Sequence, residues 1–391
     1  MWRFMTERRE PAAATSMTEV VEINAIEDLD RYHLVWNSLL SLTPGGNFFQ
    51  SLDWLKAYWQ HYGHGQKLRV LIVKSRGSAI GIVPLCVTRE RTRVGSVRVL
   101  TYPLRDWGTY YGPIGPNPTA TLVTALGHVY RTRRDWDLLD LRFVDRGRDR
   151  GRTPLAMAMS NFPAREATWK ETALVELGGS WDEYFATRTT KFRNNVRRYE
   201  KRLAELGNVE YVRYRPLGAL GGEGDPRWDL YDQCIEVAEK SWQGSSDSGT
   251  TLSHPSVRDF FRHTHALAAK LGMLDLNLLR IDGRAIAFAY NYHWDGHVLG
   301  VRVGYDPEFK NAGAGKALYA MLIRDGYARG DRVFEMGPGS MEIKTEWMTR
   351  TVHSYRYSHY PLSAPKAQAL RLKHWWLSRR ATTETVATAN A

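Results

Sequence analysis

Residues 298–316, VLGVRVGYDPEFKNAGAGK, join a strand, a glycine-containing loop and the start of a helix. Apolar and β-branched residues fill the strand, and apolar residues recur at helical spacing after Gly315. Glycines at alternate positions let successive backbone N–H groups face one anion, and the helix N-terminus adds partial positive charge. Lys310 and Lys316 add formal charge. The stretch therefore predicts an anion site that suits a pyrophosphate.

The residues before this loop predict a β-meander. Short apolar runs between 276 and 305 are separated by Asp282-Gly283 and Asp295-Gly296, which are strong hairpin signals. A strand at 332–336 follows the helix. The loop lacks the spacing of a P-loop and does not open a first βαβ unit, so neither a P-loop nor a dinucleotide fingerprint is indicated.

A comparable order of strands occurs earlier, at 68–73, 79–87, 97–102 and 137–143. With a constant offset, Gly77, Ala79 and Ile80 fall on Gly283, Ala285 and Ile286. We therefore predict an internal duplication. The first copy has no counterpart of the glycine loop, so we expect the second copy alone to bind the anion.

Composition describes an ordinary globular chain of 391 residues, with 43% hydrophobic and 25% charged residues. Its length predicts two domains. The formal charge of +12 favours acidic substrates, polyanions or anionic membrane surfaces. The distant Cys86 and Cys234 indicate neither a disulfide framework nor a zinc site, and we expect no metal. Without a signal-like or membrane-spanning stretch, we expect a cytoplasmic protein.

Two segments are notably basic. Residues 181–206 predict a basic helix, for which a solvated face is the default interpretation. Residues 362–380 predict a second basic helix that contains Trp375 and Trp376. That composition suits peripheral contact with a membrane surface, and docking onto the second domain is the alternative. We expect disordered ends at 1–18 and 381–391.

The glycine loop resembles the Q/R-x-x-G-x-G/A motif of the GNAT acyltransferases, with Lys310 in the Gln/Arg place. The resemblance extends from Lys240 to Tyr357 and is closest to the CelD-like acetyltransferases associated with cellulose biosynthesis. Its other marks are the residues 240–242 (KSW), 279–288 (LRIDGRAIAF) and 304–310 (GYDPEFK), and Gly337 followed by Lys344 and Trp347.

The resemblance implies an α/β (α+β) fold of two tandem GNAT-like modules, each a mixed, mainly antiparallel sheet flanked by helices. We expect the first module at 19–165, without a coenzyme A loop, and the second at 166–361. It also implies acetyl-CoA or another acyl-CoA as the acyl donor. The residues expected to bind it are Val301, Arg302 and Val303 on the strand, and Lys310, Asn311, Ala312, Gly313, Ala314, Gly315 and Lys316 in the loop.

Candidates for a general base are Glu335, His293 and Tyr292, because they lie on strands next to the expected site. Glu335 interrupts an apolar strand, so it either faces solvent or is functional. His293 equally suits a surface hairpin. Tyr290 and Tyr292 share strand parity with Ile286 and Phe288, which favours a core position. The expected acceptor pocket adds Trp242, Tyr290, Lys344 and Trp347, although Trp242 suits a core and Lys344 a solvated helix.

These residues lead to one principal hypothesis, an N- or O-acyltransferase acting on a sugar, an amino sugar or a polysaccharide precursor. Proximity supplies much of the acceleration in such a reaction. The alternatives are an aminoacyl-tRNA-dependent ligase, as in the related peptidoglycan-interpeptide ligases, and a basic binding module without catalysis. Nucleic acid is otherwise not an expected partner.

Overall fold

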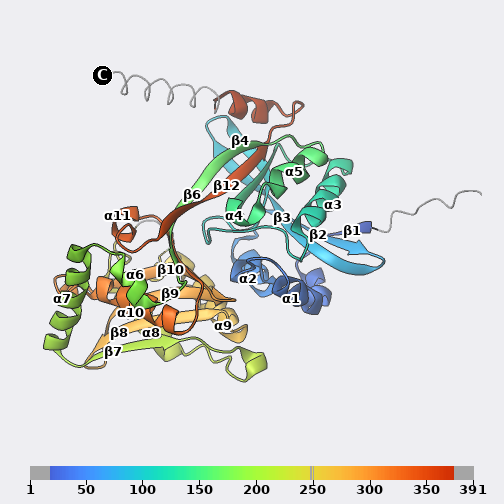
Figure 1. Ribbon diagram of the computed structural model, residues 1–391. Helices are drawn as coiled ribbons and strands as arrows, with labels where there is room; N and C mark the ends of the chain where they lie inside the picture. The colour runs from blue at the N-terminus through green and yellow to red at the C-terminus, as the bar shows by residue number, and fades with distance from the viewer. Residues whose placement is uncertain (1–17, 247–248, 250, 374–391) are drawn as a thin grey trace, which may run out of the picture.

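One continuous mixed sheet of 12 strands organises the computed structural model, which describes residues 18–246, 249 and 251–373 (Figure 1). In sheet order the strands are β1 (Thr18–Ile23), β2 (Lys67–Ser75), β3 (Ser78–Thr92), β4 (Gly95–Thr101), β5 (Leu138–Asp145), β12 (Arg350–His359), β6 (Arg165–Glu176), β11 (Val333–Pro338), β10 (His297–Tyr305), β9 (Arg284–Trp294), β8 (Leu274–Ile281) and β7 (Val209–Tyr214). The fold is therefore the predicted mixed α/β class.

Helices cover both faces of this sheet. They are α1 (His33–Ser41), α2 (Leu52–Tyr62), α3 (Pro118–Arg131), α4 (Arg146–Asp149), α5 (Arg152–Met159), α6 (Trp181–Ala186), α7 (Thr190–Leu206), α8 (Trp228–Lys240), α9 (Arg258–Lys270), α10 (Ala314–Ala328) and α11 (Met341–Lys344). We call β1–β5 with α1–α5 the first half, and β6–β11 with α6–α11 the second half. Most of the predicted leader and the whole predicted tail lie outside the described residues.

The two halves repeat one strand order, as a duplication predicts. In each half, three antiparallel strands precede a helix and a strand that pairs in parallel with the third: β2, β3, β4, α3, β5 and then β8, β9, β10, α10, β11. The hairpin turns also match in backbone geometry. Arg76 and Gly77 have φ values of 49° and 81°, and Asp282 and Gly283 have the same pair of values. Positive φ at both central residues is the type I′ signature.

Two sequence predictions are wrong in detail. The predicted helix 181–206 is broken into α6 and α7, because Thr189 is extended and caps α7 by accepting a hydrogen bond from the backbone N–H of Phe192. Ile286 does not share a face with Tyr290 and Tyr292. A β-bulge opposite Leu279 and Arg280 adds one residue to β9 and turns Ile286 to the other face.

The last strand ties the halves together. β12 lies between β5 and β6, so a segment from the end of the chain completes the sheet of the first half (Figure 1). Under this seam lies Asp140, whose side chain is fully buried. Its carboxylate accepts hydrogen bonds from Arg142, Arg356 and the hydroxyl of Ser358. These side-chain contacts join β5 to β12 in addition to the backbone pairing of the two strands.

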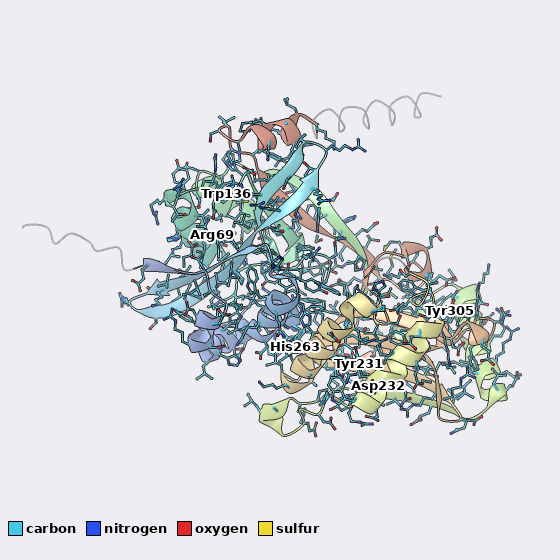
Figure 2. The ribbon with its side chains drawn as sticks, turned by 180° about the vertical axis from the view of Figure 1, so that it is seen from behind. Arg69, Trp136, Tyr231, Asp232, His263 and Tyr305 are labelled. Atoms are coloured by element: carbon cyan, nitrogen blue, oxygen red, sulfur yellow. The ribbon has the colours of Figure 1, made fainter. Side chains whose placement is uncertain are left out.

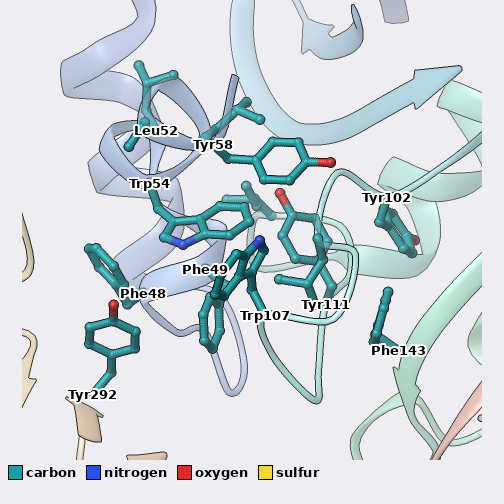
Figure 3. Packing of buried hydrophobic residues seen from close by; sticks show 14 of the residues in the cluster. Phe48, Phe49, Leu52, Trp54, Tyr58, Tyr102, Trp107, Tyr111, Phe143 and Tyr292 are labelled. Atoms are coloured by element: carbon teal, nitrogen blue, oxygen red, sulfur yellow. The ribbon is translucent and has the colours of Figure 1, made fainter. Parts of the chain in front are cut away.

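A hydrophobic core runs across the junction between the halves. Phe48 and Phe49, before α2, pack against Tyr292 of β9 with ring centroids 4.4 and 5.5 Å apart (Figure 3). Trp107 of the first half packs on Phe260 of α9 at 4.6 Å. His263 of α9 lies beside the first half, whereas Tyr305, the last residue of β10, lies away from it (Figure 2). β10 therefore leads outward from the junction.

The segment after β12 packs on the first half. Residues 365–373 are helical, and Leu370 joins a small cluster with Val97, Val99 and Leu138. The alternative that this helix docks onto the second domain is therefore wrong for its described part. Leu370 packs against strands of the first half. Trp375 and Trp376 of the predicted 362–380 helix lie outside the described residues.

We predict that Asp140→Ala lowers the free energy of unfolding by about 3–5 kcal/mol, because Arg356 loses its buried counter-charge and Arg142 keeps only the partly exposed Glu90. Asp30→Ala is the control, since Asp30 pairs with Lys56 at an exposed site and should change stability by less than about 0.5 kcal/mol. Urea unfolding of both variants measures the difference. Equal stability of the two variants would show that the seam does not depend on Asp140.

Candidate active site

The strands β10 and β11 separate in the middle of the second half. Their parallel pairing covers His297, Val298 and Leu299 opposite Val333, Phe334 and Glu335, and it stops there. On its other side, β10 pairs through Gly300 with Asn291 and through Arg302 with Tyr290, so Val301 is the extra residue of a β-bulge. The bulge and the separation leave an edge of β10 open beyond Leu299.

Close packing at the point of separation requires glycine. A Cβ at Gly300 would lie 2.8 Å from the carbonyl oxygen of Glu335, and a Cβ at Gly337 would lie 2.7 Å from the carbonyl oxygen of Gly300. Gly337 also has a φ of 74°, which L side chains rarely adopt. The two strands therefore nearly touch through their backbones before they part.

A cleft of ≈ 400 Å³ opens at this point. The second half lines it with part of β10 and β11, and the first half supplies the opposite wall. The lining residues are Leu299, Gly300, Val301, Arg302, Glu335 and Pro338 from the second half, and Asn47, Phe49, Asp106, Trp107, Gly108, Thr109 and Tyr110 from the first. A ligand in the cleft would thus meet both halves.

Glu335 is the acidic group of this cleft. Its side chain is 2% exposed, and its Oε2 atom has no hydrogen-bond partner among the described residues. Burial raises the pKa of Glu335 to about 7, although a hydrogen bond with Thr109 and the charge of Arg148 act to lower it. A carboxyl group with this pKa can hold or release a proton near neutral pH. The solvent-face interpretation of Glu335 is wrong.

Lys344 lies near Glu335 and is also buried, at 5% exposure. Its Nζ donates to the carbonyl oxygens of Gly337 at 2.7 Å and Pro338 at 3.2 Å. Burial lowers the pKa of Lys344 to about 8, against the attraction of Glu335. Lys344 is therefore not the solvated helix charge that its sequence context also allowed. It holds the end of β11 that borders the cleft.

The glycine loop stands at the outer end of β10. A 3-10 turn, η5 (Pro307–Phe309), leads to Gly313, which has a φ of 80° and precedes α10. Ala314 and Gly315 are the first residues of that helix, and N–H groups at this position have no partner within a helix. Lys310 is exposed, Lys316 pairs with Glu346 at 2.6 Å, and Arg202 of α7 donates to the carbonyl oxygen of Asn311.

The open edge of β10 connects the loop to the cleft. Arg302 donates through Nη1 to the carbonyl of Val301 at 2.5 Å, and burial lowers its pKa to about 10. The carbonyl of Val303 accepts hydrogen bonds from the indole of Trp242 and the amide of Gln243. Trp242 is 56% exposed, so it does not occupy the core position that its sequence suggested. A ligand arm along β10 would meet this indole.

Of the predicted catalytic and acceptor-site residues only Glu335 lines the cleft, and four others besides Trp242 and Lys344 lie elsewhere. Tyr290 and Tyr292 are packed in the core at the junction, and Trp347 is fully buried against Phe192 and Tyr319. His293 faces Asp331 at 3.4 Å, beside a buried ion network with Arg213 and Asp275. The structure thus brings Val301, Arg302 and Glu335 together, with Lys344 behind them.

The first-half wall of the cleft was absent from the sequence prediction. Thr109 and Tyr110 lie more than 180 residues before β10, and no spacing rule connects them to Glu335. The described residues contain no group of three His, Cys, Asp or Glu side chains suited to a metal ion. Within the same residues, no helix combines the length and apolar character needed to cross a membrane.

Residues 190–345 match the family model of an acetyltransferase (GNAT) domain. This part of the chain has a GNAT-type acyltransferase fold. The crystal structure of FemX superposes with a TM-score of 0.59 at 11% identity and covers 90% of this chain and 99% of FemX. No curated protein matches the sequence closely enough to count as a relative.

Other solved structures are more distant. A tandem GNAT protein from the clavulanic acid biosynthesis pathway has a TM-score of 0.44 and 12% identity, covering 88% of this chain and 99% of its own. The C-terminal domain of a putative lysylphosphatidylglycerol synthetase from Agrobacterium fabrum has a TM-score of 0.47 and 13% identity, covering 75% and 84%. FemX alone among these three supports the shared fold of the whole chain.

The raised pKa of Glu335 has a consequence for stability. Its folded pKa of about 7 exceeds the usual 4.5, so protonation favours the folded state. The contribution is complete below about pH 4.5 and is lost as pH rises through 7. We predict that the stability of the wild type relative to Glu335→Gln falls by roughly 3 kcal/mol over that interval. Urea unfolding at a series of pH values measures it, and a constant difference would contradict the assignment.

Proposed function

We propose that this protein is an acyl-CoA-dependent acyltransferase in which Glu335 is the general base. The observation that carries the proposal is a buried carboxyl group with an unpartnered oxygen, placed where β10 and β11 part. The GNAT domain match supports the reaction class. No metal takes part in the proposed chemistry.

The acyl donor is proposed to lie along the open edge of β10. Its pyrophosphate would rest on the N–H groups of Ala314 and Gly315, with Lys310, Lys316 and the nearby Arg202 adding positive charge. Its pantetheine arm would follow the backbone from Val303 to Val301. A β10 N–H group then faces the thioester oxygen as negative charge develops there. This arrangement brings the thioester carbon to the inner end of the cleft.

The chemistry requires one proton transfer. Glu335, in its deprotonated form, takes the proton from the attacking amine or hydroxyl of the acceptor. A C–N or C–O bond forms to the thioester carbon, the C–S bond breaks, and the proton passes to the departing thiolate to give free coenzyme A. Burial keeps the pKa of Glu335 close to neutral pH, which suits a group that must first accept and then release a proton.

For the acceptor we favour a sugar, an amino sugar or a polysaccharide precursor. The motif likeness to CelD-like acetyltransferases supports this choice. A second cleft in the first half shares Asn47 and Tyr110 with the first cleft. We place the enzyme in the cytoplasm, with the segment after β12 as its proposed contact with membrane surfaces.

We predict that isothermal titration detects coenzyme A binding and that Lys310→Glu weakens it roughly 5- to 20-fold, because an exposed cation near the pyrophosphate becomes an anion. Lys56→Glu in the first half is the matched control and should bind as the wild type does. Absence of binding by the wild type, or equal affinity of the two variants, would refute the acyl donor site.

The rate of thioester cleavage should rise with pH. With an amino-sugar panel as acceptor, we predict that kcat/KM rises with pH and levels off above about 7, where Glu335 is deprotonated. Glu335→Gln should lose about 100-fold or more of this rate while retaining coenzyme A affinity. A pH-independent rate, or full activity of Glu335→Gln, would remove Glu335 from the mechanism.

An aminoacyl-tRNA acyl donor is the second candidate. The basic helix α7 favours it, because Arg198, Lys201 and Arg202 lie on the helix that contacts the glycine loop, and Arg202 bonds to that loop directly. Co-purification with tRNA that is lost at high salt, together with no coenzyme A binding, would favour this candidate. Strong binding of vesicles or RNA without thioester cleavage by any acceptor would instead favour a non-catalytic binding module.

A further inference from the structure

The first half contains its own version of the strand opening. β4 and β5 pair in parallel at Val99 with Leu138 and at Leu100 with Leu139, after which they part. The order of elements matches that around β10 and β11, with α3 in the place of α10, but β4 ends at Thr101 whereas β10 continues to Tyr305. If the two halves were fully equivalent, an acyl donor in the first half would lie between β4 and β5, as the proposed donor lies beside β10 in the second half.

A loop of the chain itself fills that place. Residues 102–117 leave the end of β4 and bond to β5 and β3: the N–H of Tyr111 donates to the carbonyl of Phe143 of β5 at 2.9 Å, and Ile114 exchanges two backbone hydrogen bonds with Ile82 of β3. Tyr102, Leu104, Tyr111 and Ile114 are buried. In the second half, β10 turns at Asp306 directly into η5, without such a loop.

The tip of the filling loop reaches the other opening. Residues 106–110 form the first-half wall of the cleft at Glu335. The tip is held closely, since a Cβ at Gly108 would lie 2.7 Å from the ring of Phe49, and the side chain of Asn47 donates to the carbonyl of Tyr110 at 3.4 Å. Thr109 is 5% exposed, lines the same cleft as Glu335, and acts to lower the pKa of that carboxyl group.

We propose that loop 102–117, which fills the acyl donor place of the first half, completes the acceptor site of the second half, and that Thr109 is a positioning residue for Glu335. The role of Glu335 as general base rests on the function proposed above. The first half lacks the glycine loop, and its opening is filled by residues 102–117, so the second half alone is left to bind an acyl donor. The first half instead contributes a wall to the active site of the second half.

Thr109 differs from the other groups that act on Glu335. Arg148 and Asp145 of the first half and Lys344 of α11 also influence the pKa of Glu335 through their charges. Arg148 is already engaged with His297 at 2.8 Å and Asp145 at 3.2 Å, and Lys344 with two carbonyls. Thr109 is the neutral hydroxyl group that lines the cleft with Glu335 and lowers its pKa, so we infer that it orients the carboxylate without neutralising its charge.

The test compares Thr109→Val, Thr109→Ser and a matched control, Thr101→Val. Thr101 is buried at the end of β4, and its hydroxyl has no hydrogen-bond partner among the described residues. Carbon-13 NMR of glutamate-labelled protein follows the titration of Glu335, which is assigned by its loss in Glu335→Gln. This measurement needs no acceptor.

We expect Thr109→Val to raise the midpoint of the Glu335 titration by about one pH unit, because the lost hydrogen bond stabilised the charged form. Thr109→Ser should restore it, and Thr101→Val should leave it unchanged. The pH at which kcat/KM is half-maximal should shift by the same amount as the Glu335 titration. An unshifted titration in Thr109→Val, or an equal shift in Thr101→Val, would overturn the proposal. Thr109→Ala replaces the valine variant under the same criteria if that variant does not fold.

The two proposals can fail separately. If coenzyme A does not bind to the wild type but the titration shifts as expected, the acyl donor assignment fails and the Thr109–Glu335 coupling stands. If coenzyme A binds with wild-type affinity to all variants and the titration does not shift, the coupling fails and the acyl donor site stands.

Discussion

The parting of β10 and β11 is the constraint on which the site depends. A fully paired sheet offers no backbone groups to a ligand, because neighbouring strands satisfy them. Here the pairing ends at Leu299 and Glu335, and the bulge at Val301 turns β10 away. The opening exposes an edge of β10 to a ligand and sets Glu335 at its inner end. The glycine loop lies at the outer end of the same strand, so one ligand along β10 could contact both the loop and the cleft.

Burying the ionisable side chain of Glu335 destabilises the folded state unless the surrounding structure holds it in place. β11 is paired at Glu335 with β10 on one side and with β6 on the other, and Lys344 hydrogen-bonds to the residues that follow. The first half closes the remaining side. Because aromatic packing joins the halves through Phe48, Phe49 and Tyr292, the position of this wall is a property of the core and not of a hinged contact.

The sequence predicted local features well, because they depend on local chemistry. The meander, its hairpins at Asp282-Gly283 and Asp295-Gly296 and the helix after Gly313 follow from turn residues and periodicity, and the structure confirms them. It failed where tertiary contacts decide. The bulge that turns Ile286 and the exposed Trp242 have no clear periodic signal. The break before α7 is different, because Thr189 is a local capping residue that the prediction did not use. The sequence also left Glu335 ambiguous, since only the fold shows which face of β11 is enclosed.

The first-half wall shows the limit most clearly. Thr109 follows a glycine in an irregular loop, and a single sequence contains nothing that pairs this loop with β11. Only the sheet order, with β12 between the halves, brings the two together. The duplication was visible in the sequence, but the loop that fills the first opening was not.

Hydrogen exchange with and without coenzyme A tests the central claim most directly. The account predicts slower exchange on binding at residues 300–303 of β10 and at 311–316 of the loop, with unchanged exchange in β4 and β5, whose opening is already filled. Protection confined to the first half, or protection that leaves both β10 and the glycine loop unaffected, would contradict it.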